Sequence, residues 1–477
     1  MKLKIFWVLI AATTMLYGQK KNESDSDLYS LTSRIDRYIH DVMEVDEIPG
    51  VAIAVLQNSE ILYKKYFGYS NIEHKVAVSD STVFRVYSLT KLMTAVTVFQ
   101  LIGKNRLLLQ DSISNYIDDV PETWRSIQIR HLLTHSSGLP EYKDFDSSLS
   151  DYDLWKKLSG QPLRFQKGER YEYNQTGFWL LKLIIEKITQ KDFEDVVLNN
   201  QFSKAARGAF FASNSLVAYP NRTAKYIYDH KLKHYAHSTF AAGERSIAGN
   251  GLNVSLNQLV KWSKRLDNGS LLNDLLKSKL LEPFEYKNDE KRFVYGLDAY
   301  PINQHWMYGF SGGAVVDFRK FDTGLTIMIL TNGFKYRSRI ATMMRYIAGT
   351  VDDRLHDSGR TIKENIRIDL MQAIDKQHFG DNYQKAKKDY PEISFESTLN
   401  VIGYDQILAG DLEKAIKVFL INVEENPYSF NAFDSLGEAY MLLGNKQLAL
   451  KNYQKSLDLN PENENAVTMI EKLKQKR

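Results

Sequence analysis

The chain has 477 residues with ordinary apolar (43%) and charged (25%) fractions, which indicate a folded protein of about two or three domains. The formal net charge is only +4, and two of the positive charges, Lys2 and Lys4, stand at the N-terminus, so we expect no nucleic-acid partner. The absence of cysteine excludes disulfides, thiolate metal sites, a cysteine nucleophile and an N-terminal cysteine that carries lipid.

Residues 1–19 predict a cleaved secretory signal peptide. Lys2 and Lys4 precede an apolar run from Ile5 to about Leu16, and a polar stretch follows it directly. About a dozen apolar residues are too few for a transmembrane helix, which needs about 20. The other interpretations are an uncleaved anchor and a buried first strand. We expect an exported protein, periplasmic or secreted, with no membrane span once the leader is removed.

Two strand pairs are predicted, one early and one late. Runs rich in β-branched and aromatic residues at Val51–Leu56 and Ile61–Tyr66 flank a short polar turn and predict a hairpin. Further strands are expected at Gly313–Phe318 and Gly324–Leu330, with helices and loops in between. This order predicts an α+β domain over residues 28–350, whose terminal strands share one antiparallel sheet.

A serine and a lysine three residues apart form the first candidate for chemistry. Ser88 lies where polar residues give way to a long apolar stretch, which is typical of a helix start. Lys91 falls on the same helix face one turn deeper, where burial and the positive helix end lower its pKa. The neutral amine could then act as general base for the serine. The alternative is a helix-capping serine and a lysine that extends its amine to solvent.

Three histidines, His230, His234 and His237, have a spacing that could bind a metal if the segment were helical. The surrounding sequence instead predicts a polar hairpin, which would separate the three imidazoles. We therefore expect no metal site and no cofactor.

The C-terminal part carries a 34-residue repeat of small, aromatic and proline residues. The recurring pairs are Gly403 and Gly437, Gly410 and Gly444, Ala415 and Ala449, Phe419 and Tyr453, and Pro427 and Pro461. This period and residue set are typical of tetratricopeptide (TPR) repeats. Each repeat is a helical hairpin in which small residues allow close helix contact and the aromatic side chain fills the gap.

This repeat predicts an all-α tail over residues 364–477, after a polar linker at residues 351–363. The clear repeats are 396–429 and 430–463, with a degenerate hairpin expected at 364–393 and a capping helix at Glu464–Lys474. Two roles stay open for the tail. It is either a structural appendage packed on the main domain or a groove that docks a protein or peptide partner.

Several segments resemble the serine β-lactamase and penicillin-binding protein family, most closely its class C β-lactamase, DD-peptidase and esterase branch. Ser88-Leu89-Thr90-Lys91 matches the family's S-x-x-K motif. A more specific match is HLLTHSSGLP at His131–Pro140, which is similar to the family's HLLTHTSGLP and whose two histidines are expected to be structural. Further segments resemble the family in the same order, namely Gly168–Phe178, Gly249–Leu252, Lys261–Trp262, Asn268–Gly269, Tyr308–Gly313 and Leu330–Gly333.

The resemblance covers roughly residues 30–350. It implies a β-lactamase/transpeptidase-like fold, with an antiparallel sheet, helices on both sides and a helical subdomain. It also implies that Ser88 is the nucleophile, that Lys91 is its base, and that Tyr173 passes a proton to the leaving group. The backbone N–H groups of Ser88 and Gly313 would form the oxyanion hole.

Two motifs depart from the family pattern. The family's Y-x-N reads Tyr173-Asn174-Gln175, so the amide is one methylene longer, unless Asn174 takes the role after a local shift. The family's K-T-G or H-x-G reads Phe310-Ser311-Gly312, and the phenyl ring offers a substrate carboxylate neither charge nor hydrogen bond. The residues expected to line the substrate site are Asn174, Gln175, Phe310, Ser311 and Gly312.

These departures favour one kind of substrate. An ester needs less leaving-group protonation than an amide, so a weakened second motif harms ester cleavage least. Loss of the third-motif cation argues against efficient turnover of penicillins and D-alanyl peptides, which carry a carboxylate. We expect a serine hydrolase that acts on an ester or peptide-like carbonyl of a small molecule or peptide, rather than an efficient β-lactamase. The alternative is a catalytically weakened relative that binds peptides or a protein partner through its repeats.

Overall fold

The structure is a computed structural model that describes residues 29–202, 208–289, 293–375 and 378–475. The signal peptide predicted at residues 1–19 lies outside the described residues. The first described element is a helix over residues 29–45, which leads into the first strand. In the described part of the chain, no helix combines the length and the apolar character needed to cross a membrane.

An eight-stranded antiparallel sheet organises the described residues up to about 350, in the order β3-β2-β1-β13-β12-β11-β10-β9. β1 (Gly50–Gln57) pairs with β2 (Glu60–Asn71) on one side and with β13 (Leu325–Thr331) on the other. The expectation that the two terminal strand pairs share one sheet is therefore confirmed. The remaining strands are β3 (Val76–Ala77), β9 (Phe293–Val294), β10 (Leu297–Ile302), β11 (His305–Gly312) and β12 (Val316–Phe321).

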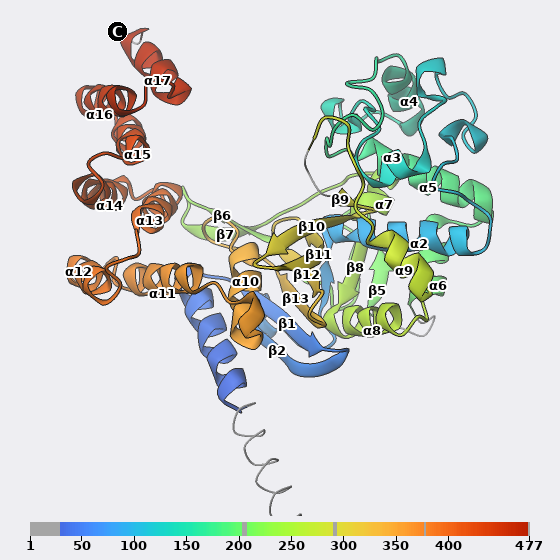
Figure 1. Ribbon diagram of the computed structural model, residues 1–477, viewed down its shortest axis with the longest axis horizontal. Coiled ribbons are helices and arrows are strands. Elements are labelled where there is room, and N and C mark those ends of the chain that lie inside the picture. Colours follow the sequence, from blue (N-terminus) through green and yellow to red (C-terminus); the bar gives the residue numbers. More distant parts are fainter. Residues whose placement is uncertain (1–28, 203–207, 290–292, 376–377, 476–477) are drawn as a thin grey trace, which may run out of the picture.

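Helices cover both faces of this sheet (Figure 1). On one face α8 (Leu256–Asp267) places Trp262 edge-on against Phe318, with ring centroids 5.9 Å apart. On the other face lies α10 (Ile340–Val351), where Tyr346 stacks on Tyr38 of the N-terminal helix with ring centroids 3.6 Å apart. The central strand β1 is apolar along most of its length and almost wholly buried, because it has no face left for water.

One predicted strand begins three residues too early. We expected a strand at Gly313–Phe318, whereas β12 begins at Val316. The cause is a tight turn after β11, in which Gly313 and Ala314 both have positive φ, 56° and 58°. This turn carries the end of β11 past the candidate nucleophile.

A helical lobe stands beside the sheet (Figure 1). Its helices are α2 (Thr90–Gly103), α3 (Ile129–Leu133), α4 (Asp151–Ser159), α5 (Thr176–Thr189), α6 (Phe193–Gln201), α7 (Ile247–Asn250) and α9 (Asp274–Leu280). A small sheet of β4 (Val83–Arg85), β8 (Leu252–Ser255) and β5 (Ala209–Phe211) leads the chain into α2. The apolar residues of the lobe and the large sheet form one continuous core.

The histidine-rich segment forms the expected hairpin, β6 (Tyr226–Asp229) and β7 (His234–His237). Nε2 of His237 lies 2.8 Å from the carboxylate of Glu73. Among the described residues, no group of three or more histidine or acidic side chains could hold a metal ion.

The C-terminal region is entirely helical, as expected. Its helices are α11 (Ser358–Gln372), α12 (Phe379–Asp389), α13 (Glu396–Leu408), α14 (Leu412–Glu425), α15 (Phe430–Leu442), α16 (Lys446–Leu459) and α17 (Glu464–Gln475). Residues 351–363, expected as a linker, include the first turns of α11. A Cβ on Gly403 would lie 2.4 Å from the ring of Phe419, so the repeat glycine is what lets α13 and α14 pack so closely.

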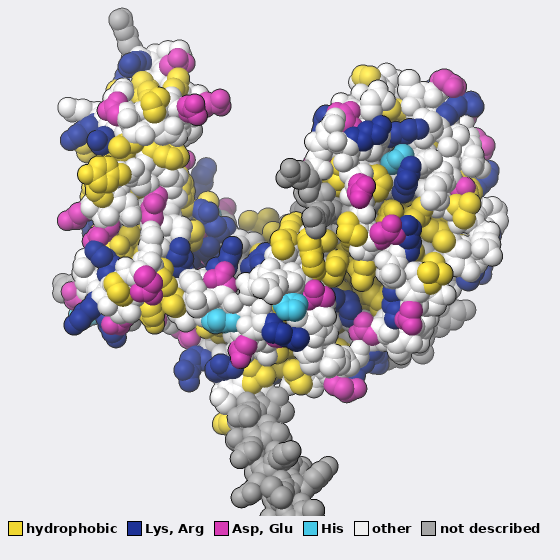
Figure 2. All heavy atoms as spheres, in the orientation of Figure 1, with side chains coloured by type: hydrophobic (Ala, Val, Ile, Leu, Met, Phe, Trp, Pro, Cys, Tyr) yellow, Lys and Arg dark blue, Asp and Glu magenta, His cyan; other side chains and the backbone are white. Residues whose placement is uncertain are grey.

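A buried ion cluster joins this array to the sheet domain. Asp46, which follows the N-terminal helix, accepts a 2.9 Å bond from Arg367 on α11, and it also faces Arg339. Arg339 pairs in turn with Asp405 on α13, and all four side chains are buried. Because breaking a buried pair leaves an uncompensated charge, these contacts anchor the array firmly. Figure 2 shows the resulting shape, with the array and the helical lobe standing as two arms on either side of a hollow.

Candidate active site

Ser88 lies in a 3₁₀ turn, Tyr87–Leu89, between β4 and α2. The preceding Tyr87 has a φ of 47°, a left-handed conformation that is unfavourable for a bulky side chain. Backbone strain of this kind concentrates at functional sites. No side-chain cap is present at the start of α2, so Ser88 is not the capping residue that the alternative interpretation required.

The hydroxyl of Ser88 lies against Tyr173. The Tyr173 hydroxyl donates a 2.8 Å hydrogen bond to Ser88 Oγ. The Ser88 hydroxyl in turn donates a 3.3 Å hydrogen bond to Oδ1 of Asn250. Burial raises the pKa of Tyr173 to about 12, so the phenol is protonated at neutral pH. Tyr173 therefore reaches the candidate nucleophile as a proton carrier rather than as a phenolate.

Lys91 is completely buried beneath Ser88 and does not extend to solvent. Its Nζ donates to Gln175 Oε1 at 2.8 Å and to the Gly249 carbonyl at 3.0 Å. Burial, reinforced by the charge of Lys143, holds the pKa of Lys91 well below its usual range. A neutral amine has two N–H groups and one lone pair, so these two acceptors occupy both donors and leave the lone pair for a proton.

The two candidates for the second-motif amide differ in position. The side chain of Gln175 contacts Lys91 and donates to the Tyr173 hydroxyl at 3.4 Å. Asn174 turns the other way: its Nδ2 donates to the Leu139 carbonyl, and its Oδ1 accepts from the Gly177 N–H. The local shift that would bring Asn174 to Lys91 does not occur.

The loop that carries Tyr173 is held from behind by two buried residues. Nδ1 of His135 accepts a 3.1 Å bond from the Asn174 N–H, and its ring packs 4.5 Å from that of Tyr173. Glu141 accepts a 2.6 Å bond from the Gln175 N–H. Burial raises the pKa of Glu141 even though these hydrogen bonds lower it. Both residues fix the backbone of the second motif.

The third-motif residues divide between the two faces of β11. The ring of Phe310 lies 6.3 Å from that of Tyr173, so Phe310 borders the candidate site. Ser311 instead bonds to Asp317 and Arg319, which share the opposite face of the sheet. The side chain of Ser311 therefore does not reach the nucleophile, contrary to our expectation.

The third-motif glycines allow the backbones to come close together. A Cβ on Gly312 would lie 2.0 Å from the Val86 carbonyl oxygen, and one on Gly313 would lie 2.6 Å from the Tyr87 ring. Within the described part of the chain, neither the Ser88 N–H nor the Gly313 N–H donates a hydrogen bond. These two N–H groups therefore remain available as the oxyanion-hole donors that the family resemblance implies.

The sequence alone did not identify two of the contacting residues, Asn250 and Gly249. Asn250 touches Ser88 Oγ and also donates to Gln175 Oε1 at 3.3 Å. Gly249 supplies the second acceptor for Lys91. Both belong to the Gly249–Leu252 segment, whose resemblance to the family was the only signal that could have pointed to them.

Comparisons with known proteins identify relatives of the chain and solved structures with a similar fold. The chain is similar to protein flp of Staphylococcus aureus (strain COL), with 27% identity over 176 residues, which are 35% of each chain. It therefore spans about a third of the length of that relative. Among solved structures, it resembles the octameric penicillin-binding protein homologue from Pyrococcus abyssi, with 20% identity and a TM-score of 0.60 over 70% of this chain and 81% of that one.

A second solved structure with the same fold is EstCE1, described as a hydrolase with promiscuous acyltransferase activity. It has 16% identity and a TM-score of 0.54, over 65% of this chain and 95% of that one. The tetratricopeptide repeat model matches residues 430–463, the second of the two repeats expected from the sequence. The Beta-lactamase family model matches residues 35–350, about two thirds of the chain, and the protein therefore belongs to the Beta-lactamase family.

Proposed function

We propose that this protein is a serine acyl hydrolase in which Ser88 is the nucleophile and Lys91 the general base. The observation that carries the proposal is the arrangement around one hydroxyl. Ser88 Oγ bonds to Tyr173, while the buried Lys91 is held one helical turn deeper by Gln175 and Gly249. A protonated phenol and a neutral amine near one serine are the two groups that acyl transfer needs.

The proposed reaction has two halves. Ser88 Oγ attacks the substrate carbonyl carbon while its proton passes to the lone pair of Lys91. The oxyanion is stabilised by the N–H groups of Ser88 and Gly313. The intermediate collapses as Tyr173 gives its proton to the leaving oxygen and regains one from the Lys91 ammonium. Water then hydrolyses the acyl-enzyme by the same proton route in reverse.

Esters are the proposed substrates. In the described part of the chain, the Tyr173 hydroxyl has one further hydrogen bond besides its bond to Ser88, the long 3.4 Å contact from Gln175 Nε2. An alkoxide or phenolate leaves with less help from such a donor than an amine does. EstCE1, described as a hydrolase with promiscuous acyltransferase activity, supports acyl transfer as the type of reaction.

We also propose that the chain is exported through its leader at residues 1–19 and divides into a hydrolase domain (28–350), a linker (351–363) and a helical domain (364–477). A protein or peptide partner is proposed for the helical domain. The match of residues 430–463 to the tetratricopeptide repeat supports this role. Detection of the protein in the periplasm or medium, shortened by about 19 residues at its N-terminus, would test the export proposal.

A substrate panel tests the proposed activity. Nitrophenyl esters, D-amino-acid amides and a β-lactam are compared on the wild-type protein and on Tyr173→Phe. Esters are expected to be cleaved fastest, and Tyr173→Phe should slow amides more than activated esters, because nitrophenolate needs little protonation. If no substrate in the panel is cleaved, the protein is instead the catalytically weakened relative that binds through its repeats.

A further inference from the structure

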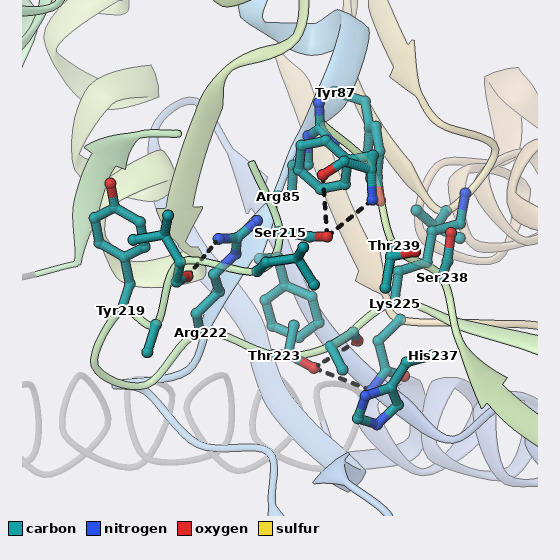
Figure 3. Close-up of a pocket in the computed structure, with 18 of the residues that line it drawn as sticks. Arg85, Tyr87, Ser215, Tyr219, Arg222, Thr223, Lys225, His237, Ser238 and Thr239 are labelled. Carbon is teal, nitrogen blue, oxygen red and sulfur yellow. Dashed lines mark hydrogen bonds between the residues drawn. The ribbon is translucent and has the colours of Figure 1, made fainter. Parts of the chain in front are cut away.

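A cavity of about 310 Å³ lies beside the nucleophile segment, separate from the Ser88–Tyr173 contact. It is lined by β4, by residues 215–225 and by residues 237–240, together with the end of β13. Three of its lining residues are cations, namely Arg85, Arg222 and Lys225, and Figure 3 shows them gathered around it with Tyr87.

No carboxylate neutralises these three cations among the described residues. Arg85 is only 9% exposed, donates to the Asn250 carbonyl at 3.1 Å, and lies over the ring of Phe240. Arg222 donates to the carbonyls of Asn214 and Val217, at 3.2 and 3.4 Å. The acid that lies next to this region, Glu73, is already paired with His237 and Tyr226. Carbonyl oxygens and aromatic faces satisfy the N–H groups, but they leave the positive charge uncompensated.

The cluster is electrostatically strained in the free protein. Burial, together with the charge of Arg222, lowers the pKa of Arg85 to about 10. Burial lowers the pKa of Lys225 as well, with a further contribution from Arg85. Unneutralised cations of this kind in one cavity favour an anion, which would relieve both the desolvation and the mutual repulsion.

The cavity is coupled to the reaction centre through the backbone. Nζ of Lys225 donates a 3.1 Å bond to the carbonyl of Gly313, whose N–H is the candidate oxyanion donor. Arg85 holds the carbonyl of Asn250, whose side chain touches Ser88 Oγ. Tyr87 lines the cavity and directly precedes Ser88. A group bound here would lie on the Tyr87 and Gly313 side of the nucleophile.

We propose that this cavity is a substrate subsite for an anionic group, a carboxylate or a phosphate, carried by the acyl part of the ester. The proposal rests on the proposed hydrolase function and narrows its substrate class. The cations come from β4 and from residues 222–225, a different wall from Phe310, where the family's third motif would supply one. The substrate charge would thus be recognised by residues outside the third motif.

Three nitrophenyl esters test the subsite, with butyryl, succinyl and 3-phosphonopropionyl acyl groups. The succinyl and phosphonopropionyl esters end in a carboxylate and a phosphonate, whereas the butyryl ester is neutral. We expect the wild-type protein to prefer at least one anionic ester by about tenfold in kcat/KM, the size of a charge-assisted hydrogen bond. A preference for the succinyl ester identifies the bound anion as a carboxylate, and a preference for the phosphonopropionyl ester identifies it as a phosphate-like group.

Substitutions then locate the preference. Arg222→Gln should lower the anionic-to-neutral ratio of kcat/KM about tenfold, and Arg222→Lys should restore part of it. Arg125→Gln, at an exposed surface arginine, is the control and should keep the wild-type ratio. The subsite is refuted if the wild-type protein shows no anionic preference, or if Arg222→Gln leaves the ratio unchanged.

A binding measurement separates this proposal from the hydrolase function. Thermal unfolding of Ser88→Ala, with and without succinate or inorganic phosphate, reports anion binding without turnover. Stabilisation by one of these anions that disappears in Ser88→Ala/Arg222→Gln supports the subsite even if no ester is cleaved. Ester cleavage without any anion effect overturns the subsite and leaves the hydrolase function intact.

Discussion

Nζ of Lys91 donates a 2.8 Å hydrogen bond to Oε1 of Gln175. Gln175 stands where the Y-x-N motif of the family has its asparagine. The longer side chain fits because residue 249 is a glycine. A Cβ there would lie only 2.7 Å from Gln175 Oε1 and 3.2 Å from Lys91 Nζ. The changed motif and the glycine opposite it therefore form one packing unit, which keeps the lysine in position.

Gly249→Ala should disturb this unit directly. The added methyl group has no room beside the two polar atoms, so Gln175 and Lys91 must move, and kcat should fall at least about tenfold because small displacements of catalytic groups are costly. The measurement is kcat on a nitrophenyl ester together with the thermal midpoint. Gly380→Ala is the control, because a Cβ at Gly380 meets nothing within 4 Å. Unchanged kcat in Gly249→Ala would show that the contact between Gln175 and Lys91 does not depend on the glycine.

Lys91→Met should abolish hydrolysis and stabilise the fold. Burial lowers the folded-state pKa of Lys91 below the unfolded value of 10.5, so at neutral pH the unfolded state holds the extra proton. The stability of the wild-type protein should therefore rise with pH towards 10.5. Lys91→Met should gain about 1–2 kcal/mol in urea unfolding at pH 7 and lose that alkaline dependence. A less stable Lys91→Met protein would show that the lysine is retained for packing.

His131 should make the protein sensitive to mild acid. Burial, reinforced by Arg130, lowers the pKa of His131 to about 3, and its Nδ1 accepts the N–H of Gln128. Between pH 6.5 and 3 the unfolded state binds one more proton, so this contribution to stability is present above pH 6.5 and lost as pH falls. The loss should approach about 1.4 kcal/mol per pH unit.

His131→Asn keeps an acceptor and cannot be protonated, so its stability should fall less steeply than that of the wild-type protein below pH 6.5. Urea unfolding at several pH values measures the two slopes. The exposed His74→Asn serves as the matched control and should follow the wild-type curve. Equal slopes in His131→Asn and the wild-type protein would locate the acid sensitivity elsewhere.

Gly403→Ala should destabilise the helical array. Its methyl group would lie within 2.4–2.8 Å of three ring atoms of Phe419, and overpacking of this kind costs about 1–3 kcal/mol. Hydrogen exchange should show faster exchange in α13 and α14, while ester hydrolysis at Ser88 is retained. Adding Phe419→Leu, which makes space, should recover part of the loss. An unchanged array in Gly403→Ala would mean that the repeat glycine is not required for packing.

The sequence identified local motifs better than spatial relations. Ser88, Lys91 and Tyr173 were expected together because each lies in a motif. In the structure, Tyr173 bonds to Ser88 and its ring lies 4.9 Å from Lys91 Nζ. The choice between Asn174 and Gln175 stayed open, because adjacent amides differ only in which way the backbone turns them. Ser311 was misplaced because the resemblance of Tyr308–Gly313 to a family strand gave no register, and the face of a side chain follows from strand register.

Features made from distant segments could not be predicted in the same way. Arg85 lies more than 100 residues before Arg222 and Lys225 in the sequence, and nothing in the local sequence links it to them. The pairing of Asp46 with Arg367 likewise joins the two ends of the fold. Such contacts depend on packing, whereas the repeat period and the S-x-x-K spacing are visible in the sequence.

Covalent labelling identifies the nucleophile directly. The wild-type protein is treated with a fluorophosphonate, which reacts with activated serine hydroxyls, and the modified peptide is identified by mass spectrometry. We expect one label on Ser88, which is absent from Ser88→Ala and forms much more slowly in Lys91→Met. A label that persists in Ser88→Ala, or no label on the folded wild-type protein, would contradict the assignment of Ser88 as the nucleophile.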